Sequence, residues 1–140
     1  MAVIARFLID TSAAARMKQP IVRDRLEPLI TGGLVGTCAT LDAEALYSAR
    51  NLGEYEQIMT DRRAAFEYLP IDDNHWNRAF RAQHSLARSG RHRAVGIADL
   101  LTATVAAQHR LTLVHYDADF EIAAQVIDLD HRWVADRGTL

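Results

Sequence analysis

The sequence has few of the features that would place it in several common protein classes. It has one cysteine, Cys38, so an internal disulfide is excluded and a reducing compartment is expected. Cys38 lies in an apolar stretch, and we interpret it as a buried, unreactive thiol. No apolar stretch approaches the roughly 20 residues of a membrane span, and Arg6 and Asp10 interrupt the apolar N-terminus in a way that is atypical of a signal peptide. We therefore expect a soluble, cytoplasmic protein with no membrane partner.

Charge of one sign is not in excess either. The chain has 16 basic and 18 acidic residues and a formal net charge of -2, which gives no overall attraction to nucleic acid, so any polyanion must be held by a local patch. The hydrophobic content of 49% over 140 residues is sufficient for one buried core. We find no internal repeat, low-complexity tract or flexible linker. One domain over residues 1–140 is predicted.

Short apolar runs alternate with longer segments of helical periodicity. Strands are predicted at residues 3–9, 35–39, 68–71, 111–116 and 126–129, and helices at residues 20–30, 41–49, 54–68, 73–87, 97–108 and 118–124. Strands that alternate with helices need crossover connections, which produce a mostly parallel sheet covered on both faces. The sequence therefore predicts an α/β fold, a three-layer α/β/α sandwich around a central, mostly parallel sheet.

Acidic residues follow two of the predicted strands. Asp10 comes directly after the strand that ends at Ile9, and Asp117 follows the strand that ends at Tyr116. Ligands bind beyond the carboxyl ends of the strands in open parallel sheets, so both carboxylates are expected at the same edge. Glu44 lies one turn into a helix and Asp99 lies in the first turn of another. Both can face that edge too.

Each of these acids also has a simpler structural interpretation. Asp10 can cap a short helix that follows it, Glu44 can be a solvated helix residue, and Asp99 can complement a helix dipole. Asp117 and Asp119 can be turn or cap residues of the next helix. The joint placement of the acids at one sheet edge, and not any single residue, favours a functional interpretation.

A convergent group of carboxylates needs protons or a cation. Two unit charges about 4 Å apart repel by roughly 4 kcal/mol at an effective dielectric constant near 20. Carboxylate oxygens without cysteine or clustered histidine favour Mg²⁺ or Mn²⁺ over Zn²⁺. His115 is the histidine near these acids, and we interpret it as an ordinary strand residue. The sequence therefore predicts a Mg²⁺ or Mn²⁺ site.

Four segments, in this order and spacing, resemble the PIN domain family and, within it, the VapC toxins of bacterial toxin–antitoxin pairs. The resemblance spans almost the whole chain, although no single segment is specific by itself. The four segments are residues 7–12, Glu44, residues 97–103 and residues 113–120.

The resemblance implies a set of site residues. Asp10, Glu44, Asp99 and Asp117 match the acidic catalytic set of the family, and Asp10, Asp99 and Asp117 are expected to be metal ligands, with Glu44 as a ligand or as the residue that positions the water. Supporting roles fall to two further residues. Ser12 matches the small hydroxyl residue often found beside the first acid, and Asp119 matches an acid that precedes a phenylalanine. Asp117 is placed first as a ligand, and metal contact by Asp119 stays open.

The resemblance also implies the activity and the partners. A PIN toxin is expected to be an endoribonuclease that cleaves RNA with Mg²⁺ or Mn²⁺, by attack of a metal-activated water on a phosphodiester. It is expected to pair with a cognate VapB-like antitoxin that inserts into the active groove, and to form a homodimer.

A basic segment precedes the helix that carries Asp99. Among its arginines, Arg91 and Arg93 lie in a loop flanked by glycine and are predicted to contact RNA phosphates. Arg81 is interpreted instead as an exposed helix residue.

Two other functions compete with cleavage of RNA. One is a PIN-like module that binds RNA or a protein without cutting, whose signature would be the loss of central acids. The other is a metal-dependent phosphohydrolase of another α/β family, in which the nucleophilic aspartate commonly has a second acid two residues later. Asp10 is followed by Thr11 and Ser12, so this second alternative is disfavoured.

Overall fold

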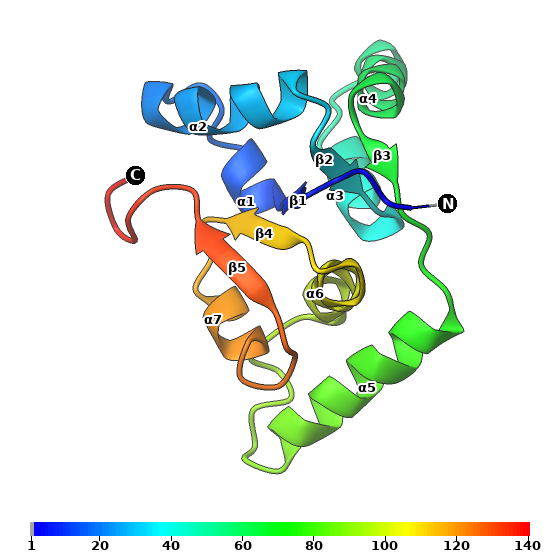
Figure 1. The fold of residues 1–140 in the computed structure, drawn as a ribbon, viewed down its shortest axis with the longest axis vertical. Helices are drawn as coiled ribbons and strands as arrows, with labels where there is room; N and C mark the ends of the chain where they lie inside the picture. The colour runs from blue at the N-terminus through cyan, green and yellow to red at the C-terminus, as the bar shows by residue number, and fades with distance from the viewer. Residues whose placement is uncertain (1) are drawn as a thin grey trace.

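Five parallel strands form the central sheet in the computed structural model, which describes residues 2–140 (Figure 1). The strands are β1 (Phe7–Ile9), β2 (Val35–Thr37), β3 (Glu67–Tyr68), β4 (Thr112–His115) and β5 (Asp130–Trp133). Their order across the sheet is β3-β2-β1-β4-β5, and each neighbouring pair is parallel. The two central strands, β1 and β4, both end at the same edge.

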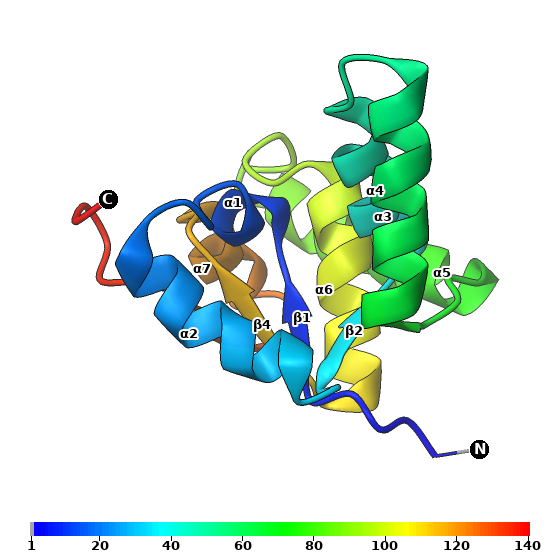
Figure 2. The same cartoon turned by 90° about the horizontal axis from the view of Figure 1, so that it is seen from above.

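Helices connect the strands and cover both faces of the sheet. They are α1 (Thr11–Ala14), α2 (Pro20–Thr31), α3 (Ala39–Tyr47), α4 (Leu52–Ala65), α5 (Asp73–Ala87), α6 (Ile97–His109) and α7 (Asp119–Ala123). Figure 2 shows α2 along one side of β1 and β4, with α6 on the other side. No helix within residues 2–140 is long and apolar enough to cross a membrane.

Two apolar clusters hold these layers together, because successive side chains of a strand point to opposite faces. Ile9 of β1 and Val114 of β4 pack with the buried residues of α1 and α2. Leu8 and Leu113, their neighbours, pack instead with buried residues of α3, α5, α6 and α7. The predicted α/β/α sandwich with a parallel sheet is therefore confirmed.

The helix α6 is the most deeply placed element, since residues 100–106 are all buried. Its alanines and threonines are small enough to lie close to the sheet and to α5. Asp99 stands at the start of this helix, one residue before the buried stretch. The rigid surroundings of α6 fix the position of this carboxylate.

One predicted strand is wrong. Residues 126–129 were predicted as a strand because they are mostly apolar, but they form a turn and a short coil, and Val126, Ile127 and Leu129 pack against the larger core cluster. The last strand, β5, begins at Asp130. It lies at the sheet edge and alternates exposed and half-buried residues, so its polar sequence does not have the apolar pattern of a central strand.

The ends of other elements differ from the prediction by a few residues. The first strand begins at Phe7 and not at residue 3, because the backbone N–H groups of Ile4 and Ala5 donate to the carboxylate of Glu67 at 3.0 and 2.8 Å. The fourth helix ends at Ala65, and β3 follows directly at Glu67, earlier than the predicted strand at residues 68–71. These shifts do not alter the end of β1 or the start of α6, which position Asp10 and Asp99.

Candidate metal centre

The ends of β1 and β4 bring two acids of the predicted set to the same edge of the sheet. Ile9 is in register with Val114, and the backbone N–H of Asp10 donates to the carbonyl oxygen of Val114 at 2.8 Å. Asp117 follows the end of β4 two residues after His115. The parallel pairing therefore places both carboxylates on adjacent chain segments, as the sequence predicted.

Asp10 is a buried carboxylate with one satisfied oxygen and one free oxygen. Its side chain is 4% exposed. Oδ2 accepts the backbone N–H of Ser12 at 3.0 Å and the hydroxyl of Ser12 at 2.6 Å, so the helix-cap interpretation is correct for this atom. Oδ1 is buried and has no hydrogen-bond partner within residues 2–140. A buried, unpartnered carboxylate oxygen calls for a proton or a cation.

Ser12 connects the ends of the two central strands. Its hydroxyl donates to Asp10 and accepts the backbone N–H of Tyr116 at 2.9 Å. The same side chain thus fixes the rotamer of one acid and the chain that leads into Asp117. Ser12 supports the acids through hydrogen bonds, in the position that the sequence predicted for it.

Asp99 lies close enough to the other acids for their charges to affect it. Burial and then the negative charges of Asp10, Glu44, Asp117 and Asp119 raise the pKa of Asp99 to about 7. The other predicted acids therefore all lie near enough for their charges to act on this carboxyl group. A divalent cation at this point would offset the repulsion and favour the ionised form.

The last two aspartates complete the cluster. Asp99, Asp117 and Asp119 each offer a carboxylate oxygen, and these atoms lie within 4.8 Å of one another. Oδ1 of Asp117 accepts the backbone N–H of Asp119 at 2.9 Å, and burial with the charge of Asp117 raises the pKa of Asp119. Asp119 was left open by the sequence, and its carboxylate belongs to this group. The predicted ligand Asp10 is not a member of this three-carboxylate group, and neither is Glu44, which is half-buried on α3.

His115 supports the backbone of Asp117, a contact that sequence reasoning missed. Burial and the neighbouring His131 lower the pKa of His115 to about 4, so the ring is neutral at pH 7. Its Nδ1 accepts the backbone N–H of Asp117 at 3.1 Å, and its Nε2 lies 2.9 Å from Nδ1 of His131. Both ring nitrogens are thus occupied, which favours a positioning role for His115 over metal ligation.

A pair of threonines connects the helices that carry Glu44 and Asp99. The hydroxyl of Thr102 donates to the carbonyl oxygen of Ala98 at 3.0 Å and lies 2.6 Å from the hydroxyl of Thr40. This pair joins α6 to α3 at the level of the acids. This contact could not be predicted from the sequence, because it joins residues 62 positions apart.

A basic residue that the sequence did not single out contacts the segments around the acids. Arg16 donates to the carbonyl oxygen of Ser12 at 2.6 Å, and its guanidinium lies 4.5 Å from the centre of the Tyr116 ring. Arg91 donates to Ser89 and to Gln125, both at 2.9 Å, in the exposed loop before α6. Arg93 is exposed in the same loop. RNA contact by Arg91 and Arg93 stays a prediction.

Comparison with curated proteins places this acidic edge in a known family. The family model of the PIN domain matches residues 7–126. Ribonuclease VapC21 of Mycobacterium tuberculosis is 42% identical over 134 residues, which cover 96% of this chain and 97% of that protein. Ribonuclease VapC51 of the same organism is 38% identical over 136 residues, with 96% and 97% covered.

Solved structures share the fold. The chain aligns with a member of the VapBC family of toxin–antitoxin systems, VapBC-5 of Mycobacterium tuberculosis, at 27% identity and a TM-score of 0.61, covering 90% of this chain and 97% of that one. DNA-bound VapBC from Salmonella typhimurium aligns at 19% identity and a TM-score of 0.72, covering 94% and 99%. The matched family model, the curated relatives and the acidic sheet edge agree, and the chain belongs to the PIN domain family and, within it, to the VapC type.

Proposed function

We propose that this protein is a metal-dependent endoribonuclease and the toxin of a toxin–antitoxin pair. The observation that carries the proposal is the free, buried Oδ1 of Asp10 beside the three-carboxylate group. The full-length similarity to proteins named ribonucleases supports RNA as the substrate. The chain is proposed to act as one domain over residues 1–140.

The chemistry of the donor set fits Mg²⁺ or Mn²⁺. All of its members are carboxylates, which are the hard oxygen ligands that these ions prefer. Asp10, Asp99 and Asp117 would hold the ion, Asp119 can add a fourth carboxylate, and Glu44 would act as a ligand or orient the attacking water. When bound, such an ion polarises the scissile phosphate and lowers the pKa of the attacking water.

The protein's own residues would prepare the site for this reaction. Ser12 holds Oδ2 of Asp10, so that Oδ1 stays available. Neutral His115 holds the backbone of Asp117. The Thr40–Thr102 pair fixes α3 against α6, and with them Glu44 and Asp99. Such preorganisation is what a hydrolytic centre needs, because a displacement of the ligands of even 1 Å lowers the rate strongly.

The proposed partner is a VapB-like antitoxin, since related folds occur in VapBC assemblies. An exposed apolar surface beside the acidic edge supports a protein partner. Tyr47 is 92% exposed and Leu52 is 71% exposed, where α3 turns into α4. Apolar side chains of this size gather at protein interfaces. The antitoxin or the second copy of a homodimer, in the cytoplasm, would cover them.

Cleavage assays test the proposal directly. Purified tRNA, rRNA and mRNA are incubated with the protein and Mg²⁺, Mn²⁺ or EDTA. The wild type is compared with Asp10→Asn and Asp99→Asn. The matched control is Asp24→Asn, because Asp24 is an exposed aspartate on α2, far from the cluster in the fold.

Cuts that need a divalent ion, persist in Asp24→Asn and disappear in both site variants are the expected result. Cleavage that survives in EDTA would contradict metal dependence. RNA binding without any cutting, by a folded and metal-loaded protein, would favour the non-cleaving PIN-like module.

A further inference from the structure

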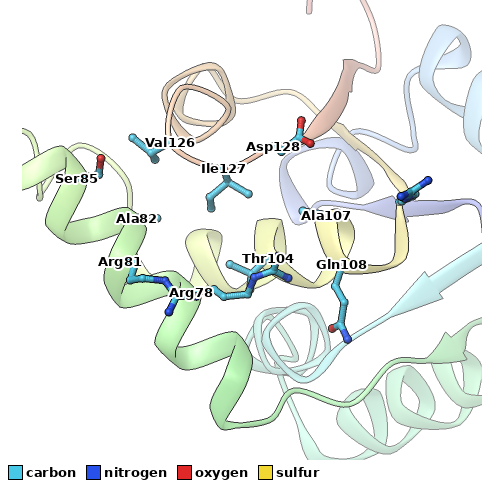
Figure 3. A pocket seen from close by; sticks show the side chains of 11 residues that line it. Arg78, Arg81, Ala82, Ser85, Thr104, Ala107, Gln108, Val126, Ile127 and Asp128 are labelled. Atoms are coloured by element: carbon cyan, nitrogen blue, oxygen red, sulfur yellow. The ribbon is translucent and has the colours of Figure 1, made fainter.

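A groove lies between α5 and α6, away from the acids. It encloses about 540 Å³ and is continuous, through Arg78, Arg81 and Gln108, with a second hollow of about 350 Å³. We call this surface the α5–α6 groove. It is lined by Arg78, Arg81, Ala82, Ser85, Thr104 and Gln108, with Arg110 and residues 126–128 at its margins. Figure 3 shows α5 on one side of it and α6 on the other, with Ile127 and Asp128 opposite α5.

The groove is basic in a protein that is acidic as a whole. Its lining contains three arginines and one acid, the exposed Asp128, whereas the whole chain has a net charge of -2. Within residues 2–140, the side chains of Arg78, Arg81 and Arg110 form no ion pair and no hydrogen bond. Three guanidinium groups are therefore free to bind an anion.

Gln108 adds an oriented hydrogen-bond donor to the groove. His75 accepts the backbone N–H of Asp72 through Nδ1, so its Nε2 carries the proton and donates to Oε1 of Gln108. The oxygen of Gln108 is thus occupied and its amide NH₂ is free. An amide donor beside guanidinium donors suits a backbone phosphate, which accepts hydrogen bonds only.

Arg110 occupies a backbone conformation that favours glycine. It closes α6 in the left-handed region, with φ of 55°, and is the one non-glycine residue with positive φ in residues 2–140. Glycine is the usual residue at this place after a helix because a side chain there is strained. An arginine at this position can be explained by a binding role in the groove or by the attraction of its charge to the negative carboxyl end of α6. The two explanations predict different effects of Arg110→Gly.

The lining favours nucleic acid over a protein partner. No phenylalanine, tyrosine or tryptophan lines either hollow, whereas protein interfaces commonly depend on such buried anchors. Arg78 and Arg81 lie one helical turn apart, with Cβ atoms about 5–6 Å from each other. This arrangement suits contacts to the sugar–phosphate backbone.

We infer that the α5–α6 groove binds backbone phosphates of the RNA substrate outside the acidic centre, through Arg78, Arg81, Arg110 and the amide of Gln108. This inference rests on the proposed function for the identity of the RNA as substrate. Gln108 lies nine residues after Asp99 on α6, about 14 Å along the helix axis. A large, structured RNA presents many phosphates and can contact both sites at once, whereas a short oligonucleotide held at the acidic centre leaves fewer phosphates for the groove.

Salt-dependent binding tests this inference. Anisotropy is measured in an Asp99→Asn background, which prevents cutting, with a hairpin RNA of transfer-RNA size and with a pentanucleotide. Arg78→Gln with Arg81→Gln is expected to weaken hairpin binding on the order of tenfold, and to reduce the slope of log affinity against log salt by about 1.5. The loss for the pentanucleotide is expected to be smaller. The control is Arg23→Gln, an exposed arginine on α2 across the sheet.

Arg110→Gly separates binding from a structural role. Removing strain at φ of 55° raises or preserves the midpoint of thermal unfolding. Loss of the guanidinium weakens hairpin binding. A stable variant with reduced RNA affinity is the expected result. A less stable variant with unchanged affinity would assign Arg110 to the helix end alone and remove it from the groove.

The remaining outcomes also decide the question. Equal hairpin affinities and equal salt slopes for the parent and the double variant would overturn the inference. A loss of binding to inorganic phosphate or to polyglutamate, with hairpin binding unchanged, would overturn it in favour of a small-anion or an acidic-peptide site. If no RNA is cut but the double variant still loses hairpin affinity, the proposed function fails and the groove stands.

Discussion

The two ends of α6 differ in charge and in the way the fold builds them. At its amino end, Asp99 lies near acids that follow β1 and β4 and an acid on α3, and burial and then the charges of these acids raise its pKa to about 7. At its other end, Arg78, Arg81 and Arg110 lie on exposed helix positions. The ends of neighbouring strands and the start of α6 bring the acids together, whereas Arg78 and Arg81 are neighbours because they lie three residues apart on one helix.

The largest effect is expected when a carboxylate is removed from the acidic cluster at the amino end of α6. Asp10→Asn replaces the free Oδ1 or Oδ2 with an amide nitrogen, which does not ligate a cation. RNA cleavage is expected to fall on the order of a thousandfold, because metal and phosphate lose their positions together. Single-turnover cleavage checks this value. Asp24→Asn should retain parental rates, and an active Asp10→Asn enzyme would remove this residue from the centre.

A smaller effect is expected when a carboxylate is kept but loses a hydrogen bond that orients it. Ser12→Ala leaves Oδ2 of Asp10 without the 2.6 Å hydrogen bond and frees the backbone N–H of Tyr116. Residues that orient metal ligands typically contribute about 10–100-fold. We expect that loss in the apparent affinity for Mn²⁺, measured by activity against metal concentration. Ser12→Thr keeps the hydroxyl and should recover most of it. Equal metal dependence in Ser12→Ala would contradict the positioning role.

Because the acids repel one another, replacing one of them is expected to lower activity and to raise stability. The pKa of Asp99 is raised in the folded state from about 4 to about 7, so the metal-free protein loses stability as the pH rises from 4 through 7. Asp99→Asn should abolish activity, raise the midpoint of thermal unfolding at pH 7.5 without metal, and flatten this pH dependence. Calorimetry in EDTA tests it. A destabilised variant at pH 7.5 would show that the acids do not repel as described.

The smallest expected effect concerns the loop that connects α5 to α6. Arg91 already donates to Ser89 and Gln125, so it is less free than Arg93. Arg93→Gln is expected to weaken RNA binding by about twofold to threefold, and Arg91→Gln by less, because exposed charges contribute modestly. Anisotropy at low salt measures both. A larger loss in these variants than in Arg78→Gln with Arg81→Gln would move the main RNA contact from the groove to the loop.

The fold could be predicted largely because its central strands are buried and apolar. Residues 7–9 and 112–115 have the short apolar runs of inner strands, with Asp10 directly after the first and Asp117 two residues after the second. The edge strand β5 could not be found in this way, since its Asp130–Trp133 sequence has no apolar run. Residues 126–129 are apolar because they cover the core as a turn, which has the same composition as a strand.

The candidate site, too, could be predicted from the sequence only in part. The carboxylates at strand ends and helix starts were visible from their position along the chain. The hydrogen bond of His115 to Asp117, the Thr40–Thr102 pair and the place of Arg16 depend on distances across the fold, which periodicity does not encode. Arg81 was interpreted as a surface residue, and the groove beside α6 appears only when α5 is packed against it.

The most direct test of the central claim is a calorimetric titration of Mn²⁺ into the metal-free wild type and the Asp10→Asn variant at neutral pH. The account predicts saturable binding to the wild type and its loss in the variant, because the buried Oδ1 of Asp10 is the oxygen that lacks any other partner. Equal binding to both proteins, or no binding to the wild type, would contradict an acidic centre built to hold a divalent cation.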